Sequence, residues 1–332
     1  MWLGCLVGGA ATIVILALIG GAVFTMFFAM ATMGGAGAAV TKAGVALQEL
    51  TISGELGDPK VAVIPVYGVL VRDAGTWDED PVLLLRAMLR AARDDKNVKG
   101  VILSVDSGGG GITTCDLMRK EIIDYRQETN NPVVTLMEDV AASGAYYVAC
   151  GTDHVLAHPT TITGSIGVMF PLFDASGLLD KVGVRDRTVK TGEFKNIGSP
   201  FAEKTEEQWQ REKDLLANIV QQMHERFVQI VAEGRDLDVE TVRSLADGRI
   251  YTSQEALDNG LIDGIGYHDD AVEKVKLLAG LADAHVMAYQ RVPSVLELLL
   301  GLGGREVKVR LDGAMPTASG ELPMYLWSPA MQ

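Results

Sequence analysis

Short runs of β-branched residues alternate with helical segments between residues 60 and 150, and this alternation constrains the fold more than any other feature. Buried strands are predicted at 61–70, 100–105 and 133–137, and helices at 80–93, 113–128 and directly after Ser143. Strands and helices that alternate in this way form parallel sheets, with each helix crossing over one face. The sequence therefore predicts an α/β fold with its functional site at the carboxyl ends of the strands.

The second half of the chain is predicted to contain one long helix and several shorter elements. A Thr205-x-x-Gln208 capping box opens the long helix, which is expected to run to Glu233 and to end at Gly234. Two short strands are expected at 154–158 and 187–190, and two short helices at 239–246 and after Thr252.

The N-terminal segment carries no charged side chain before Lys42. Residues 11–33 are almost wholly apolar and exceed the roughly 20 residues that a helix needs to cross a bilayer. A cleaved signal peptide would have a basic start and a shorter apolar core, so an uncleaved transmembrane helix is favoured. The sequence therefore predicts an anchor at 1–41, a linker at 42–59, an α/β domain at 60–285 and a C-terminal extension at 286–332.

Charge and cysteine content exclude several classes of function. The formal net charge is -14 and the basic residues are scattered, which argues against a nucleic-acid partner. The three cysteines (Cys5, Cys115 and Cys150) form no C-x-x-C pair, so neither a disulfide framework nor a zinc site is indicated, and Cys150 is expected in the core. No metal or cofactor is expected.

Two local features are compatible with acyl transfer. The glycine turn at 108–111 follows a strand and could direct backbone N–H groups at an oxyanion, although many such turns are glycine-rich for steric reasons alone. Ser143 begins a helix after a buried strand, where it could be either a nucleophile or an ordinary helix cap. No histidine is well placed as its base, and the G-x-S-x-G spacing of a nucleophile elbow is absent.

Four ordered motifs resemble those of bacterial and archaeal signal peptide peptidase A. They read AASGAYY at 141–147, TGSIGV at 163–168, KTGEFKNIGSP at 190–200 and ADGRIYT at 246–252. The resemblance covers about residues 60 to 280 and implies a crotonase-like (ClpP-like) α/β superhelix that assembles into homo-oligomeric rings or domes. Two departures are visible: the family's S-P-G-G turn reads SGGG at 107–110, and its S-G-G-Y-Y reads SGAYY at 143–147.

The resemblance also implies roles for particular residues. Ser143 corresponds to the nucleophile and Lys195 to the general base, while Ser165 would orient the lysine amine. The backbone amides of Gly110 and Gly144 would form the oxyanion hole. A lysine acts as a base only when its amine is uncharged, and burial disfavours the charged form. We therefore expect Lys195 to be largely buried, with no carboxylate in direct contact and with a surface role left to Lys190.

The implied activity is that of a membrane-bound serine endopeptidase with a Ser/Lys dyad. Its substrates would be apolar peptides such as remnant signal peptides, and the chain would cross the cell membrane once, with the protease domain outside the cytoplasm. Two alternatives remain open: crotonase-like acyl-CoA hydratase or isomerase chemistry, with the Gly110 turn polarising a thioester, and a non-catalytic membrane scaffold. Thioester turnover would favour the first, and failure of Ser143 to react with a serine-directed electrophile would favour the second.

Overall fold

A ten-stranded mixed sheet organises the residues that the computed structural model describes, which are 39–40, 45–57, 59–72 and 80–292. Its strands are β1 (Ala39–Val40), β2 (Ala46–Ser53), β3 (Lys60–Tyr67), β4 (Val98–Ser107), β5 (Val133–Ala142), β6 (His154–Ala157), β7 (Ile162–Gly164), β8 (Ile250–Thr252), β9 (Gly264–Ile265) and β10 (His285–Arg291).

The helices of the described chain connect these strands. They are α2 (Pro81–Asp94), α3 (Ile112–Thr129), α4 (Gly144–Ala149), α5 (Ser176–Val182), the 3-10 helix η2 (Glu193–Asn196), α6 (Glu206–Arg235), α7 (Val239–Leu245), α8 (Ser253–Asp258) and α9 (His268–Ala279). Asp80 caps α2 and Pro81 is its first residue, as the sequence predicts. The predicted transmembrane helix at 11–33 lies outside the described residues, among which no helix has both the length and the apolar character needed to cross a membrane.

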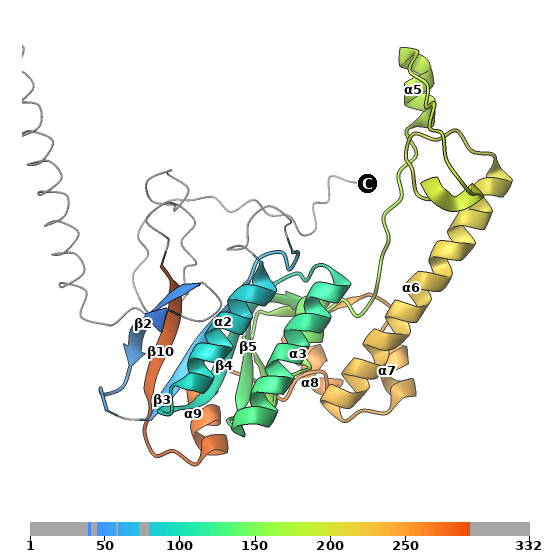
Figure 1. Ribbon diagram of the computed structural model, residues 1–332. Helices are drawn as coiled ribbons and strands as arrows, with labels where there is room; N and C mark the ends of the chain where they lie inside the picture. The colour runs from blue at the N-terminus through green and yellow to red at the C-terminus, as the bar shows by residue number, and fades with distance from the viewer. Residues whose placement is uncertain (1–38, 41–44, 58, 73–79, 293–332) are drawn as a thin grey trace, which may run out of the picture.

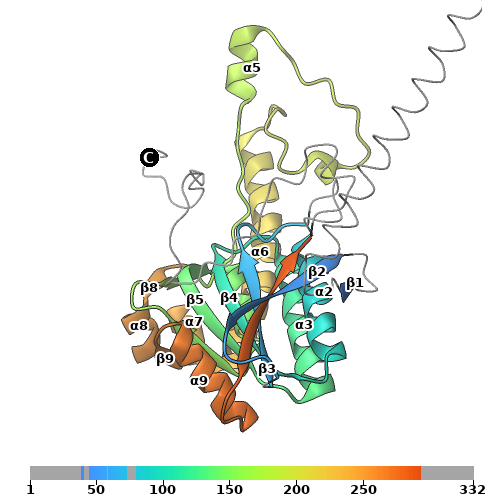
Figure 2. The same cartoon turned by 90° about the vertical axis from the view of Figure 1, so that its left-hand side faces the viewer.

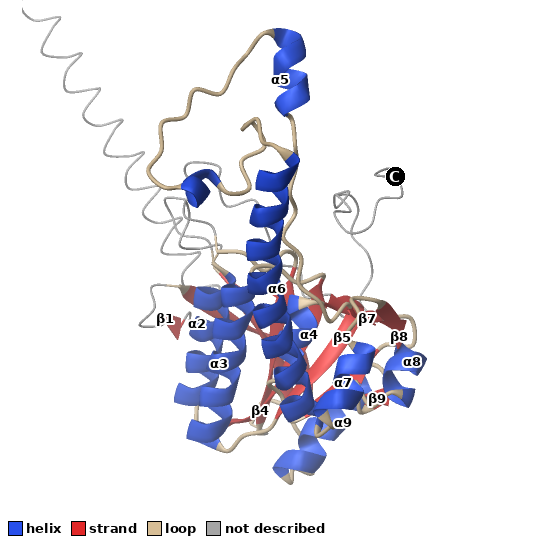
Figure 3. Cartoon of the chain, turned by 90° about the vertical axis from the view of Figure 1, so that its right-hand side faces the viewer, coloured by secondary structure: helices blue, strands red, loops and turns tan. Residues whose placement is uncertain are grey.

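Parallel pairing dominates the centre of the sheet. The strand order is β1-β2-β10-β3-β4-β5-β6-β9, and every pair from β10 to β9 is parallel. One apolar core lies beneath α2, α3, α4 and α6, and a smaller one lies on the other face beneath α9 (Figures 1 and 3). The predicted α/β fold with parallel strands and crossover helices is confirmed.

The two halves of β5 pair with different strands along the same edge, β6 first and then β7. Residues 134–137 of β5 pair with β6, whereas residues 140–142 pair with β7, which in turn pairs antiparallel with β8. The last residues of β5 are therefore held by a separate small ribbon. The element that follows them, α4, begins at the carboxyl edge of the sheet, where the site was predicted.

The sheet also extends beyond the segment from which it was predicted. β2 lies within 42–59, which was expected to be a linker, and pairs antiparallel with β10, which runs past residue 285. The prediction of a strand at 187–190 is wrong, because that segment has no strand geometry. A strand needs a partner for its backbone groups, and none of the described strands pairs with this segment.

The arm, defined as residues 169–204 with α5 and η2, projects away from the sheet alongside the N-terminal half of α6 (Figures 1 and 2). The capping box of Thr205 and Gln208 opens α6 as predicted, but α6 continues past Gly234 to a left-handed cap at Asp236. Gly234 serves packing instead, since a Cβ there would lie 2.4 Å from the carbonyl oxygen of Cys150.

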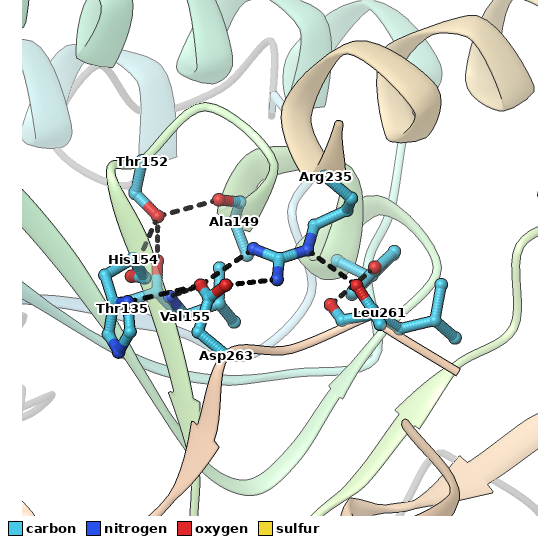
Figure 4. A network of polar contacts seen from close by, with 10 residues as sticks. Thr135, Ala149, Thr152, His154, Val155, Arg235, Leu261 and Asp263 are labelled. Carbon is cyan, nitrogen blue, oxygen red and sulfur yellow. Dashed lines mark hydrogen bonds and ion pairs between the residues drawn. The ribbon is translucent and has the colours of Figure 1, made fainter. Parts of the chain in front are cut away.

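A partly exposed ion pair fixes the base of α6 on the sheet (Figure 4). Arg235 donates to both carboxylate oxygens of Asp263, at 2.9 and 2.6 Å, and its Nε donates to the carbonyl of Gly260. The same carboxylate accepts from the N–H of Val155 at 2.7 Å. One end of α6 is thereby joined to β6 and to the turn before β9, while the other end carries the arm.

Candidate active site

Ser143 adopts a backbone conformation that is rare for a residue with a side chain. Its φ is 53° and its ψ is -120°, a region that is strained for L-residues and that recurs at functional sites. Its side chain makes no capping hydrogen bond to α4. The interpretation of Ser143 as an ordinary helix cap is therefore not supported, because a capping serine has an extended backbone and an engaged hydroxyl.

The glycine turn after β4 is braced by the segment that follows β3. Leu70 donates its N–H to the carbonyl of Gly109 at 2.9 Å, and Gly111 donates to the carbonyl of Leu70 at 2.8 Å. A Cβ at Gly110 would lie 2.1 Å from that same Leu70 oxygen, so no side chain fits there. The brace by Leu70 was not anticipated from the sequence, where residues 61–70 were predicted only as a strand.

Two unused backbone donors lie together beside Ser143. A Cβ built on Gly144 would be 3.1 Å from the amide nitrogen of Gly110, so the glycine turn and the start of α4 touch. Neither of these two N–H groups has an acceptor among the described residues. Paired donors of this kind, adjacent to a strained serine, have the arrangement required to stabilise a developing oxyanion.

Ser165 lies next to Ser143 at the end of the neighbouring strand. Ala142 is paired with Gly164 in the parallel ladder of β5 and β7, and each of these residues is followed by one of the two serines. Ser165 also has a positive φ, 49°, and its N–H donates to the carbonyl of Arg249 at 2.8 Å. The structure therefore brings Ser143, Ser165, Gly110 and Gly144 to one edge of the sheet.

Lys195 does not join this group within the chain. It lies on η2 in the arm and is exposed, so the predicted burial is wrong for a single copy. Glu193 of η2 pairs with Arg211 of α6 at 3.1 Å, whereas Phe227 of α6 packs on Tyr147 of α4 with ring centroids 5.2 Å apart. The helix rises about 24 Å between Arg211 and Phe227, at 1.5 Å per residue.

The Lys190 side chain forms hydrogen bonds within the arm. Its Nζ donates to the backbone carbonyl of Glu193 at 2.6 Å and also to the Asn196 side chain. Both acceptors belong to η2, so Lys190 closes the turn that presents Lys195. The two lysines of this motif therefore differ in their environment, and Lys195 is the one whose amine has no hydrogen bond or ion pair to the described residues.

The side chains beneath the site do not supply an alternative nucleophile or a metal site. A Cβ on Gly144 would lie 2.4 Å from the Cys115 sulfur, and burial raises the pKa of this thiol to about 12, which keeps it protonated. Cys150 is also buried, as predicted. Within the described ranges, no group of three or more His, Cys, Asp or Glu side chains could hold a metal ion.

Comparisons with known proteins agree with the motifs. Residues 125–282 match the model of peptidase family S49. The chain is 42% identical over 202 residues to a putative signal peptide peptidase SppA of Enterococcus faecium, covering 61% of this chain and 57% of that protein. It is 35% identical over 224 residues to a putative protease of Synechocystis, covering 67% of this chain and 75% of that protein.

A solved structure of ClpP1 from Listeria monocytogenes is also similar, with a TM-score of 0.41 and 14% identity, covering 63% of this chain and 94% of that one. The chain spans 57% of the length of the Enterococcus relative, which is less than two thirds.

Proposed function

The chain belongs to peptidase family S49, the signal peptide peptidase A family, and from that premise we propose that it is a serine endopeptidase with a Ser143/Lys195 dyad. One observation supports this most strongly. Ser143 is held in a strained conformation with its hydroxyl outside any capping bond, and the free N–H groups of Gly110 and Gly144 lie beside it. A structural serine needs none of these features.

We propose that Lys195 reaches Ser143 of a neighbouring copy in a homo-oligomer. The arm that carries it exposes large apolar side chains, among them Met169 (87% exposed), Phe173 (73%) and Val189 (98%). Apolar groups exposed in this density mark surfaces that become buried in an interface. Contact with a second copy would cover the arm, and the same contact would supply the dry surroundings that an uncharged lysine needs.

The proposed reaction proceeds in two halves. The neutral amine of Lys195 takes the proton from Ser143 Oγ as this oxygen attacks the peptide carbonyl, and the resulting oxyanion accepts hydrogen bonds from Gly110 and Gly144. The C–N bond then breaks, and the ammonium returns its proton to the leaving amine. Water attacks the acyl-serine with the same base, which releases the new carboxyl end and restores Ser143. Ser165, placed beside Ser143, would orient the lysine amine.

The proposed substrates are apolar peptides such as remnants of signal peptides. The name of the Enterococcus relative supports this class, and so does the apolar stretch at residues 11–33, which would hold the enzyme at a membrane as a single-pass anchor. We further propose that the assembled fold is a crotonase-like (ClpP-like) superhelix and that the catalytic domain lies outside the cytoplasm.

The proposal is tested on the full-length protein in detergent with a fluorophosphonate probe and an apolar reporter peptide. We expect the probe to label Ser143, which mass spectrometry of the tryptic peptide would identify. Ser143→Ala should abolish both labelling and cleavage, and Lys195→Ala should lower cleavage by about 1,000-fold or more. Cleavage by either variant at the wild-type rate would refute the dyad, and turnover of an acyl-CoA thioester in place of the peptide would favour hydratase or isomerase chemistry.

A further inference from the structure

A buried cluster of three oxygen-bearing side chains joins the three central strands just below the site. Tyr67 Oη donates to Glu138 Oε1 at 2.9 Å and lies 2.6 Å from Ser104 Oγ, which also donates to Glu138 Oε1. Ser104 and Glu138 are 3% and 8% exposed. We call Tyr67, Ser104 and Glu138 the oxygen cluster.

The oxygen cluster lies on the face of the sheet that α9 partly covers. Side chains alternate between the two faces of a strand, and Val63, Ile102 and Leu136 belong to the core beneath α9. Tyr67, Ser104 and Glu138 follow these three residues by an even number of positions, so they point to the same side. Buried polar groups are unusual among such apolar neighbours, and each of the three is hydrogen-bonded.

The cluster coincides with an interruption in the backbone pairing of β5. Val105 of β4 pairs with Met137 of β5, but the next pair is Ser107 with Ala141, so β5 contains extra residues at this point. A bulge of this kind bends the strand and leaves part of it without ladder hydrogen bonds. The bulged stretch begins at Glu138 and ends at Val140, three residues before Ser143.

Side chains replace the missing ladder. The Glu138 carboxylate is held by β3 and β4 through the cluster, and its backbone carbonyl accepts from Thr161 Oγ1. The N–H of Val140 donates to Asp106 Oδ1 at 3.2 Å. β7 pairs with one edge of β5 here, whereas on the β4 side the path of β5 into Ser143 depends on side-chain contacts, of which Glu138 has the most.

Each strand in the cluster leads directly into one component of the proposed site. Tyr67 ends β3 three residues before Leu70, which braces the glycine turn. Ser104 precedes Gly110 by six residues, and Glu138 precedes Gly144 by six. A shift of one strand against the others would thus change the separation between the two N–H donors and the nucleophile.

We propose that Tyr67, Ser104 and Glu138 are positioning residues, which hold Ser143 and Gly144 in register with Gly110 across the bulge in β5. This role rests on the proposed function of Ser143. The cluster touches neither of the reacting groups and acts through the backbone of three strands.

The test compares Glu138→Ala and Glu138→Gln with Thr135→Val as the matched control. Thr135 lies on the same strand, is fully buried and shares a 3.1 Å contact with Thr152, whose hydroxyl keeps a bond to Ala149 in the variant. Thr135→Val therefore removes a buried hydrogen bond from β5 at a distance from the bulge. The rate constant for fluorophosphonate labelling of Ser143, kcat and KM for the reporter peptide, and Tm are measured for each full-length protein.

We expect Glu138→Ala to lower the labelling rate constant and kcat by about 100-fold, with KM changed less than about threefold, because misplaced reacting groups lose rate without losing binding. Glu138→Gln keeps an acceptor and a donor in the cluster and should stay within about fivefold of wild type. Thr135→Val should lower Tm but label at the wild-type rate. Equal labelling of Glu138→Ala and wild type, or an equal loss in Thr135→Val, would overturn the positioning role.

Tyr67→Phe provides a second route if Glu138→Ala does not fold. It removes one hydroxyl and should lower the labelling rate constant by about tenfold, whereas an unchanged rate in the folded variant would overturn the proposal. A wild-type protein that is not labelled at Ser143 at all would overturn the proposed function together with the role that depends on it. Normal labelling of wild type and Tyr67→Phe alike would overturn the positioning role alone.

Discussion

The backbone N–H of Ser143 donates a 2.8 Å hydrogen bond to the carbonyl of Gly164, the last residue of β7. This bond joins the end of β5 to the β7–β8 ribbon and holds Ser143 at a positive φ. The same ribbon carries Ser165, so the strained serine and its neighbour are fixed by one set of backbone contacts. Ser143 is therefore positioned from two sides, by the ribbon and by the glycine turn.

Replacing Gly164 should disturb Ser143 through the backbone carbonyl that accepts the Ser143 N–H. Gly164 has a φ of 82°, and a Cβ there would lie 2.5 Å from the ring of Tyr251, so alanine is disfavoured by both conformation and space. We expect Gly164→Ala to lower the free energy of unfolding by about 1–3 kcal/mol and to reduce peptide cleavage by at least tenfold. Chemical denaturation and reporter cleavage measure the two effects, and full activity in a destabilised variant would show that the ribbon does not position Ser143.

The glycine turn offers a prediction with an internal control. In Gly110→Ala the new methyl would meet the Leu70 carbonyl oxygen at 2.1 Å, which must displace the amide that faces the site. In Gly111→Ala the nearest atom, Thr114 Oγ1, would be 3.2 Å away and no positive φ is involved. Loss of one oxyanion donor costs about 100–1,000-fold in kcat, so we expect a loss of this size for Gly110→Ala and only a few-fold change for Gly111→Ala. Similar losses in both variants would contradict the assignment.

The central strands and helices could be predicted from the sequence because their signals are local. β-branched runs marked β3, β4 and β5, and Asp80 with Pro81 marked the start of α2. The strands β2 and β10 were not predicted, because they pair residues more than 200 positions apart and no local pattern records such a pairing. The candidate site was predicted from motifs, whereas the strain at Ser143 and the brace by Leu70 are products of tertiary structure.

Two predictions that are wrong, a strand at 187–190 and the burial of Lys195, both concern the arm. Residues 187–190 have strand-like composition, and Lys195 needs burial to act as a base, yet the described chain provides no partner strand and no cover for either. Both expectations require contacts that the described residues do not provide. The local composition of the arm does not record whether such contacts exist, so neither outcome could be predicted from these residues alone.

The ion pair of Arg235 and Asp263 at the base of α6 should contribute to stability. Burial alone would raise the pKa of Asp263, but hydrogen bonds from Arg235 and from the Val155 N–H outweigh it and hold this pKa below its usual range. We expect Arg235→Met to lower the free energy of unfolding by about 1.5–3 kcal/mol, because the hydrogen bonds from the guanidinium to Asp263 and Gly260 are lost. Arg243→Met, which breaks solvent-accessible pairs with Glu225 of α6 and Glu240 of α7, should leave Tm nearly unchanged. Equal Tm losses in the two variants would contradict this account.

The raised pKa of Glu138 in the oxygen cluster should make the stability of the protein depend on pH. Burial raises the pKa of Glu138, nearby Asp106 adds to this, and the hydroxyls of Ser104 and Tyr67, together with His158, oppose it. A folded-state pKa above the unfolded value contributes stability at low pH that is lost as the pH rises through the folded-state pKa. The Tm of wild type relative to Glu138→Gln should therefore be higher at pH 5 than at pH 8. A difference that is constant or grows with pH would contradict a raised pKa of Glu138 in the folded state.

The central claim, that Ser143 of one copy is served by Lys195 of another, is tested most directly by mixing two inactive variants. Ser143→Ala and Lys195→Ala chains carrying different tags are co-expressed, mixed oligomers are isolated through both tags, and cleavage of the apolar reporter is measured. A working site needs the serine of a Lys195→Ala chain beside the lysine of a Ser143→Ala chain, and random mixing places this combination at about a quarter of the sites, so about a quarter of wild-type activity should return. Mixed oligomers no more active than either variant alone would contradict the account.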